Sequence, residues 1–122
     1  ENLYYLIENF ERFVPCLVTI KKETYEEIGP HALPIIIQEK AKFTRTQLVN
    51  YLEKSGIDTR NLFSSMPTQC HGFGYLGHKI GDFPNAEYIG ENGIHIGVHQ
   101  DLGRQACDFI LNTIEKFLQN HA

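Results

Sequence analysis

Apolar residues recur at three- and four-residue spacing in three stretches of the chain, which predicts amphipathic helices with one buried face. A fourth, shorter helix is expected where proline stands in a first turn, because proline is pre-organised for that position. Thr44 and Gln47 have the spacing of a capping box and mark the start of the second helix. The four predicted helices are Asn2–Phe13, Thr44–Ser55, Pro84–Asn92 and Leu102–Gln119.

Runs of apolar and β-branched residues between these helices predict strands. Pro34 falls inside the second run, and proline cannot donate a ladder hydrogen bond, so an edge strand or a strand that starts after Pro34 is expected. Residues 64–85 have no regular period, but their aromatic side chains favour an ordered segment. The predicted strands are Cys16–Ile20, His31–Gln38, Ile57–Phe63 and Ile94–Val98.

Neither a repeat nor a linker divides the chain, so residues 1–122 are predicted to form a single domain. The order of elements predicts the α+β class, with a small, mostly antiparallel sheet covered by helices on one face. The other face of such a sheet is left for water or for another domain.

The composition excludes several classes of protein. Lys and Arg number 11 against 15 Asp and Glu, and the net charge of −4 argues against a nucleic-acid binder, which needs clustered positive charge. No apolar run approaches the roughly 20 residues of a membrane helix. Three scattered cysteines and no visible signal peptide make a reducing cytoplasm the expected location. The chain begins at Glu1 and its only methionine is Met66, so a longer protein is expected.

Three motifs that resemble functional sites fail on their context. Gly72–Gly77 fits the G-x-G-x-x-G dinucleotide fingerprint, but a strand is not predicted before it nor a helix after it. His95 and His99 would lie about 13 Å apart on a strand, too far to share one metal ion. Cys70 and His71 are sequence neighbours, which are seldom catalytic partners. We therefore expect no metal site, and a histidine-based metal enzyme stays only as an alternative.

Thr59 and Arg60 stand in a short predicted strand just before the long irregular segment. The arginine side chain presents a fixed fork of donors that suits a carboxylate or a phosphate. From spacing alone, a surface ion pair is the favoured explanation for an arginine at this position.

From about Phe43 onward, the order of motifs resembles the pyridoxal-phosphate-dependent nucleotide-sugar aminotransferases and their dehydrase relatives, the DegT/StrS type. The G-D-F-P-N-A-E stretch, followed by a strand and a final helix, is the most specific element. The matching stretches are Phe43–Leu48, Gly56–Phe63, Gly81–Glu87 and Ile94–His99.

The resemblance implies that this chain is the small C-terminal domain of a longer enzyme. The large domain of that family carries the cofactor and a Schiff-base lysine, or the histidine that replaces it in dehydrases, and this chain has none of its motifs. Pyridoxal phosphate is thus expected in the full-length enzyme and none in this fragment, which is expected to lack catalytic residues and to be inactive alone. The implied partners are its own N-terminal large domain, a nucleotide-sugar substrate and a second subunit in a homodimer.

By the same resemblance, the small domain closes one side of the active site and helps to orient the substrate. Arg60 is the first choice for an anion contact there. Leu62–Phe63 after it lies nearer the dehydrase branch, while Met66–Gln69 fits neither branch, so both remain open. The candidate substrate-binding residues are Arg60, Thr59, Gln69, His71, His78 and His99.

A free-standing ligand-binding or protein-interaction module is the alternative from another class, and it predicts an initiator methionine just before Glu1. If the chain is instead a detached domain, the apolar patch that it exposes is expected to cause self-association.

Overall fold

The structure, a computed structural model, describes residues 1–29, 31–62 and 66–121. Within them, four strands form one sheet in the order β1-β2-β4-β3, and every neighbouring pair is antiparallel. This confirms the predicted α+β class with an antiparallel sheet. The strands are β1 (Leu17–Val18), β2 (Ala32–Ile37), β3 (Thr59–Asn61) and β4 (Gly93–Gly97).

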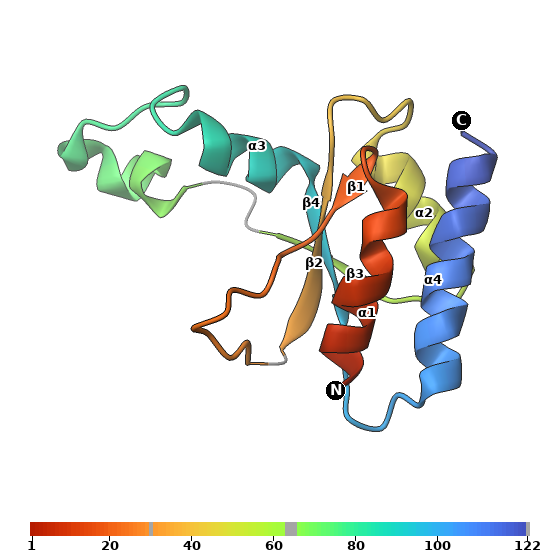
Figure 1. The fold of residues 1–122 in the computed structure, drawn as a ribbon. Coiled ribbons are helices and arrows are strands. Elements are labelled where there is room, and N and C mark those ends of the chain that lie inside the picture. Colours follow the sequence, from red (N-terminus) through yellow and green to blue (C-terminus); the bar gives the residue numbers. More distant parts are fainter. Residues whose placement is uncertain (30, 63–65, 122) are drawn as a thin grey trace.

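Three helices cover one face of this sheet, as Figure 1 shows on the right of the strands. They are α1 (Asn2–Phe10), α2 (Arg45–Lys54) and α4 (Arg104–Gln119). A fourth helix, α3 (Pro84–Asn92), runs into β4 and lies on the opposite side of the sheet together with the segment before it (Figure 1). The sheet therefore has a helix-covered face and a largely open face.

The burial of β2 alternates in step with this arrangement. Leu33, Ile35 and Ile37 are buried against the helices, whereas Pro34 and Ile36 on the other face are half-exposed. Successive side chains of a strand point to opposite faces, so one face enters the core and the other does not. The helices complete the core with Leu3, Leu6, Phe10, Leu48, Leu52, Cys107, Leu111, Ile114 and Phe117.

The expectation for Pro34 was wrong, because β2 is a central strand that contains this proline. The carbonyl oxygen of Pro34 faces the β1 side, where it accepts a hydrogen bond from Thr19 Oγ1. The ladder of β1 reaches only Ile36 and Ile37, so it has ended before Pro34. The missing N–H of proline therefore removes no ladder hydrogen bond, and β2 continues through it.

The observed helix boundaries agree with the predicted ones more closely than the observed strand lengths do. The capping box is present: Thr44 Oγ1 accepts from the backbone N–H of Gln47, whose side chain accepts from the Thr44 N–H. The first helix tightens at Glu11 into a 3₁₀ turn, η1 (Glu11–Phe13). The first and third strands are shorter than predicted, and Phe63 at the end of the third lies outside the described residues.

The irregular segment contains two short 3₁₀ helices, η2 (Pro67–Gln69) and η3 (His71–Leu76). We call residues 66–83 the arm, since in Figure 1 they project from the sheet on the side away from α1, α2 and α4. Ser64 and Ser65, which begin the predicted segment, lie outside the described residues. The aromatic side chains do not order the arm as expected: Tyr75 is 80% exposed and Phe73 43%. No helix among the described residues is long and apolar enough to cross a membrane.

Candidate functional site

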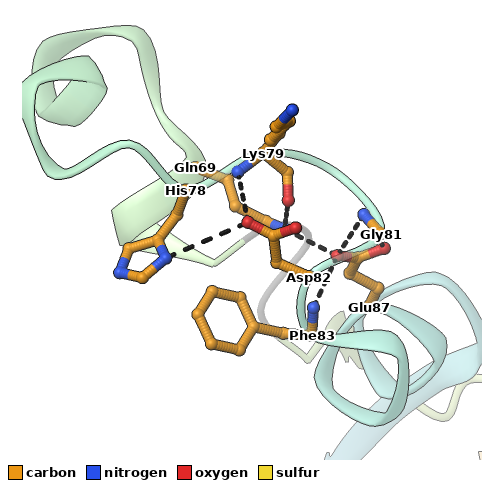
Figure 2. Close-up of polar contacts among 7 residues, drawn as sticks. All are labelled: Gln69, His78, Lys79, Gly81, Asp82, Phe83 and Glu87. Carbon is orange, nitrogen blue, oxygen red and sulfur yellow. Dashed lines mark hydrogen bonds and ion pairs between the residues drawn. The ribbon is translucent and has the colours of Figure 1, made fainter.

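The carboxylate of Glu87, in the first turn of α3, accepts hydrogen bonds from several residues of the arm (Figure 2). Its Oε1 accepts from the side-chain amide of Gln69 at 2.6 Å and from the backbone N–H of Gly81 at 2.8 Å. The N–H of Phe83 donates to the same oxygen at 3.3 Å. These hydrogen bonds stabilise the ionised form and hold the pKa of Glu87 below its ordinary value, with the Gln69 amide as the largest cause. We call this set of contacts the Glu87 clasp.

A second group of polar contacts lies beside the clasp in Figure 2. Asp82 Oδ2 accepts from the backbone N–H of Lys79 at 2.8 Å, and the Lys79 carbonyl accepts from the Gln69 amide at 2.8 Å. His78 Nδ1 lies 4.0 Å from Asp82 Oδ2, and its ring meets the ring of Phe83 edge-on at 5.0 Å between centroids. Gln69 and His78, both predicted as site residues, thus meet in one cluster.

Thr59 and Arg60 point to opposite faces of the sheet. Thr59 is 7% exposed, and its hydroxyl and backbone N–H both donate to Glu53 Oε1 of α2, at 2.6 and 2.7 Å. Its hydroxyl therefore joins β3 to α2. The Arg60 guanidinium is exposed and donates to Asp58 Oδ1 at 2.7 Å, which raises the pKa of Arg60 above its ordinary value.

Arg60 lies in a row of residues across the open face of the sheet. The register pairs Arg60 of β3 with His95 of β4, and His95 in turn with Pro34 of β2. The ring of His31 stacks beside the ring of His95, with centroids 6.1 Å apart. Sequence reasoning did not include His95 among the site residues. The alternation in β4 could have indicated its position. Ile94 and Ile96, on either side of His95, face the core, so His95 faces the open side of the sheet.

His99 lies elsewhere, at the end of β4. Its Nδ1 is 3.4 Å from Asp101 Oδ2, and it lines a groove of about 340 Å³ whose other walls include Gly97, Leu102 and Phe109 of α4. Asp58 also lines this groove, so the ion-pair partner of Arg60 and His99 share one rim. His71 is exposed on η3 of the arm, away from both.

The six predicted site residues are therefore distributed over three places: the arm, the β3 edge of the sheet, and the groove beside α4. Within the described residues no cluster of three or more histidine, cysteine, aspartate or glutamate side chains could hold a metal ion. Residues 72–76 belong to η3, which Gly77 ends, and no α-helix begins until Pro84, so the strand-to-helix geometry of a dinucleotide fingerprint is absent from these described residues.

The family model described as the DegT/DnrJ/EryC1/StrS aminotransferase family matches residues 1–115. A dTDP-4-dehydro-2,6-dideoxy-D-glucose 3-dehydratase of Saccharopolyspora spinosa is 31% identical over 96 residues, which cover 73% of this chain and 21% of that protein. The chain spans between 20% and 30% of the lengths of the curated relatives that it matches.

Solved structures share the fold at lower identity. The sugar aminotransferase Spr1654 of Streptococcus pneumoniae, described as putative and in its PMP form, superposes with a TM-score of 0.76 at 17% identity, over 99% of this chain and 31% of that chain. An E. coli GDP-4-keto-6-deoxy-D-mannose-3-dehydratase with bound hydrated PLP gives a TM-score of 0.65 at 24% identity, over 92% of this chain and 28% of that chain. With nearly its whole length matched by the family model, this chain belongs to the DegT/DnrJ/EryC1/StrS aminotransferase family.

Proposed function

We propose that this chain is the small C-terminal domain of a longer, homodimeric pyridoxal-phosphate enzyme that either transfers an amino group to a nucleotide-linked ketosugar or removes a hydroxyl from one. One observation carries the proposal: 99% of this chain superposes on only 31% of a sugar aminotransferase. The chain thus superposes on one part of that longer chain, which supports the proposal. The relatives whose names state a reaction include both branches, so the proposal spans both.

Under the proposal, this chain is not expected to bind pyridoxal phosphate by itself. All seven lysines are exposed, so none lies in the kind of apolar pocket that activates a nucleophilic lysine. Under the proposal the cofactor, which supplies an electron sink when bound, is held by the large domain outside these residues. The role of this chain is to close one side of the active site and to orient the substrate.

Arg60 is our first candidate for contact with an anionic part of the substrate. It is exposed on the open face, on a strand rather than on a loop, and the imidazole of its cross-strand neighbour His95 offers a further hydrogen-bond donor to an anion. Asp58 holds the guanidinium until an anion replaces that contact. Gln69, His71, His78 and His99 are weaker candidates, and we leave Thr59 out because Glu53 occupies its hydroxyl.

The test is to express both this 122-residue chain and the longer polypeptide encoded by its gene. The longer protein is expected to show the visible absorbance of bound pyridoxal phosphate and to act on a nucleotide-linked ketosugar, while the chain alone takes up no cofactor. Stoichiometric uptake of pyridoxal phosphate by the chain alone, or turnover by it, would contradict the proposal. A gene that starts with a methionine codon just before Glu1 would favour the free-standing module instead.

A further inference from the structure

Helix α3 is tied to the rest of the domain by two hydrogen bonds with segments that are distant from it in the sequence. The Tyr88 hydroxyl donates to the carbonyl oxygen of Ile37, at the end of β2, at 2.8 Å. The Arg45 guanidinium, from the first turn of α2, donates to the carbonyl oxygen of Gly90 at 2.8 Å. One bond therefore joins α3 to β2, and the other joins α3 to α2.

Arg45 stands where its charge does not stabilise its own helix. It is the first residue of α2, directly after the N-cap residue Thr44, and the N-terminal end of a helix disfavours a cation. None of the ion pairs within the described residues includes Arg45. The contact that accounts for an arginine at this position is therefore the one with α3.

Gly90 presents a suitable acceptor to this guanidinium. Its carbonyl is among the last four of a helix that ends at Asn92, and such carbonyls have no partner within the helix. The same end of α3 carries the negative end of the helix dipole, which favours a cation. Gly90 is also buried, and a buried carbonyl needs a donor, which Arg45 supplies.

The orientation of α3 sets the position of the arm. The arm directly precedes α3 in the chain, and the Glu87 clasp binds it to the first turn of this helix. In Figure 1, α3 links the arm to β4, so a tilt of α3 would carry the arm with it. Two of the candidate substrate-binding residues, Gln69 and His78, belong to the arm, whereas Arg60 belongs to the sheet. The alignment of these candidates thus depends on what holds α3.

We propose that Arg45 is a positioning residue of the longer enzyme. By holding the C-terminal end of α3, it fixes the arm, with Gln69 and His78, at one angle to the sheet that carries Arg60. Arg45 contacts neither the substrate nor the cofactor and acts through α3. This inference rests on the proposed function, because it requires that the arm contacts the substrate.

The test uses the longer polypeptide with pyridoxal phosphate bound and a nucleotide-linked ketosugar as substrate. It compares Arg45→Ala with Lys54→Ala, which removes an exposed cation from the other end of the same helix. In Arg45→Ala, amide exchange in α3 and in the arm is expected to become several-fold faster, while amides of β2 and α4 exchange as before. KM for the ketosugar rises several-fold, and kcat changes less than twofold. Lys54→Ala changes none of these quantities.

Two further variants separate positioning from folding. Arg45→Lys keeps a cationic donor and is expected to recover most of the exchange protection and most of the wild-type KM. Tyr88→Phe removes only the hydroxyl that binds Ile37, and it is expected to accelerate exchange in the arm and to raise KM, as Arg45→Ala does. A merely structural role of Arg45 would instead lower the thermal midpoint and the amount of active enzyme without changing KM.

Two results would overturn the inference. In one, α3 and the arm exchange no faster in Arg45→Ala than in Lys54→Ala, so the bond to Gly90 does not hold the helix. In the other, exchange accelerates in Arg45→Ala or Tyr88→Phe but KM stays at the wild-type value, so the angle of the arm does not affect substrate binding. Failure of the proposed function has a separate signature in the wild-type polypeptide: it binds no pyridoxal phosphate and does not act on the ketosugar, although Arg45→Ala still accelerates exchange in the arm.

Discussion

The side-chain amide of Gln69 donates to the carboxylate of Glu87 across 2.6 Å, although 18 positions separate the two residues along the chain. This contact and the two backbone N–H groups from Gly81 and Phe83 tie the arm to the start of α3. Acidic groups are favoured in the first turn of a helix, so Glu87 serves the helix and the arm together. The position of the arm therefore depends on one carboxylate.

Glu87→Gln is expected to loosen the arm without unfolding the core. The variant keeps one acceptor oxygen but loses the negative charge, and hydrogen bonds to a charged group are the stronger kind. Exchange at the amides of Gly81 and Phe83 should become at least several-fold faster, while amides of β2 and β4 exchange as before. Glu91→Gln, an exposed carboxylate on the same helix, is the control and should change neither. Equal effects of the two variants on amide exchange would show that the Glu87 clasp does not hold the arm.

The arm is also expected to loosen in acid. The folded-state pKa of Glu87 is held below its ordinary value of 4.5, chiefly by the Gln69 amide. A lowered pKa in the folded state stabilises the protein fully above the ordinary value, and that stability is lost as the pH falls through the lowered value. The amide resonances of Gly81 and Phe83 should therefore shift with pH only below the ordinary range. In Glu87→Gln this titration should be absent, and its persistence there would assign it to another group.

Gly93→Ala is expected to destabilise the sheet. A Cβ at this position would clash with the backbone oxygen of Ile89 and would lie 2.6 Å from Leu62 Cδ1, closer than these atoms can approach. Overpacking of this kind costs about 1–3 kcal/mol. Gly97→Ala on the same strand is the control, since nothing lies within 4 Å of its Cβ. Urea unfolding of both variants measures the difference, and equal midpoints would contradict the close approach.

Thr59→Val is expected to lower the free energy of unfolding by about 1.5–3 kcal/mol, the usual range for a hydrogen bond to a charged group. The variant keeps the shape of the side chain and loses the bond from Oγ1 to Glu53 at 2.6 Å. Thr59→Ser keeps the hydroxyl and should retain most of the stability. A Val variant as stable as wild type would show that the bond to the Glu53 carboxylate contributes nothing.

Arg60→Gln separates a substrate contact from a structural ion pair. The Arg60–Asp58 pair is exposed on both sides, so its loss should leave the thermal midpoint of the chain almost unchanged. In the longer enzyme, loss of a charged hydrogen bond to the substrate should raise KM about tenfold. Lys116→Gln, an exposed cation on α4, should leave both quantities unchanged. An unchanged KM for Arg60→Gln would exclude Arg60 from the substrate site.

Local pattern determined the elements of this fold with little help from tertiary structure. The helical spacing of α1 and α4 predicted the apolar faces that lie in the core, because amphipathic periodicity follows directly from element geometry. A continuous run of apolar and β-branched residues predicted β2 as a strand. Thr44 and Gln47 marked the start of α2 because a capping box is complete within four residues. The motif order also indicated the family, which the family model confirms over residues 1–115.

Register and long-range contacts were decided only by the tertiary structure. Pro34 lies in a central strand because β1 ends before it, and the sequence of β2 alone does not show where its neighbour ends. Arg60 and His95 are neighbours because two strands distant in sequence pair antiparallel, and Glu87 meets Gln69 because the arm turns back on α3. Hydrogen bonds between distant segments depend on how the whole chain packs. They leave no periodic trace in the sequence, so the sequence alone identified neither the Glu87 clasp nor the position of His95.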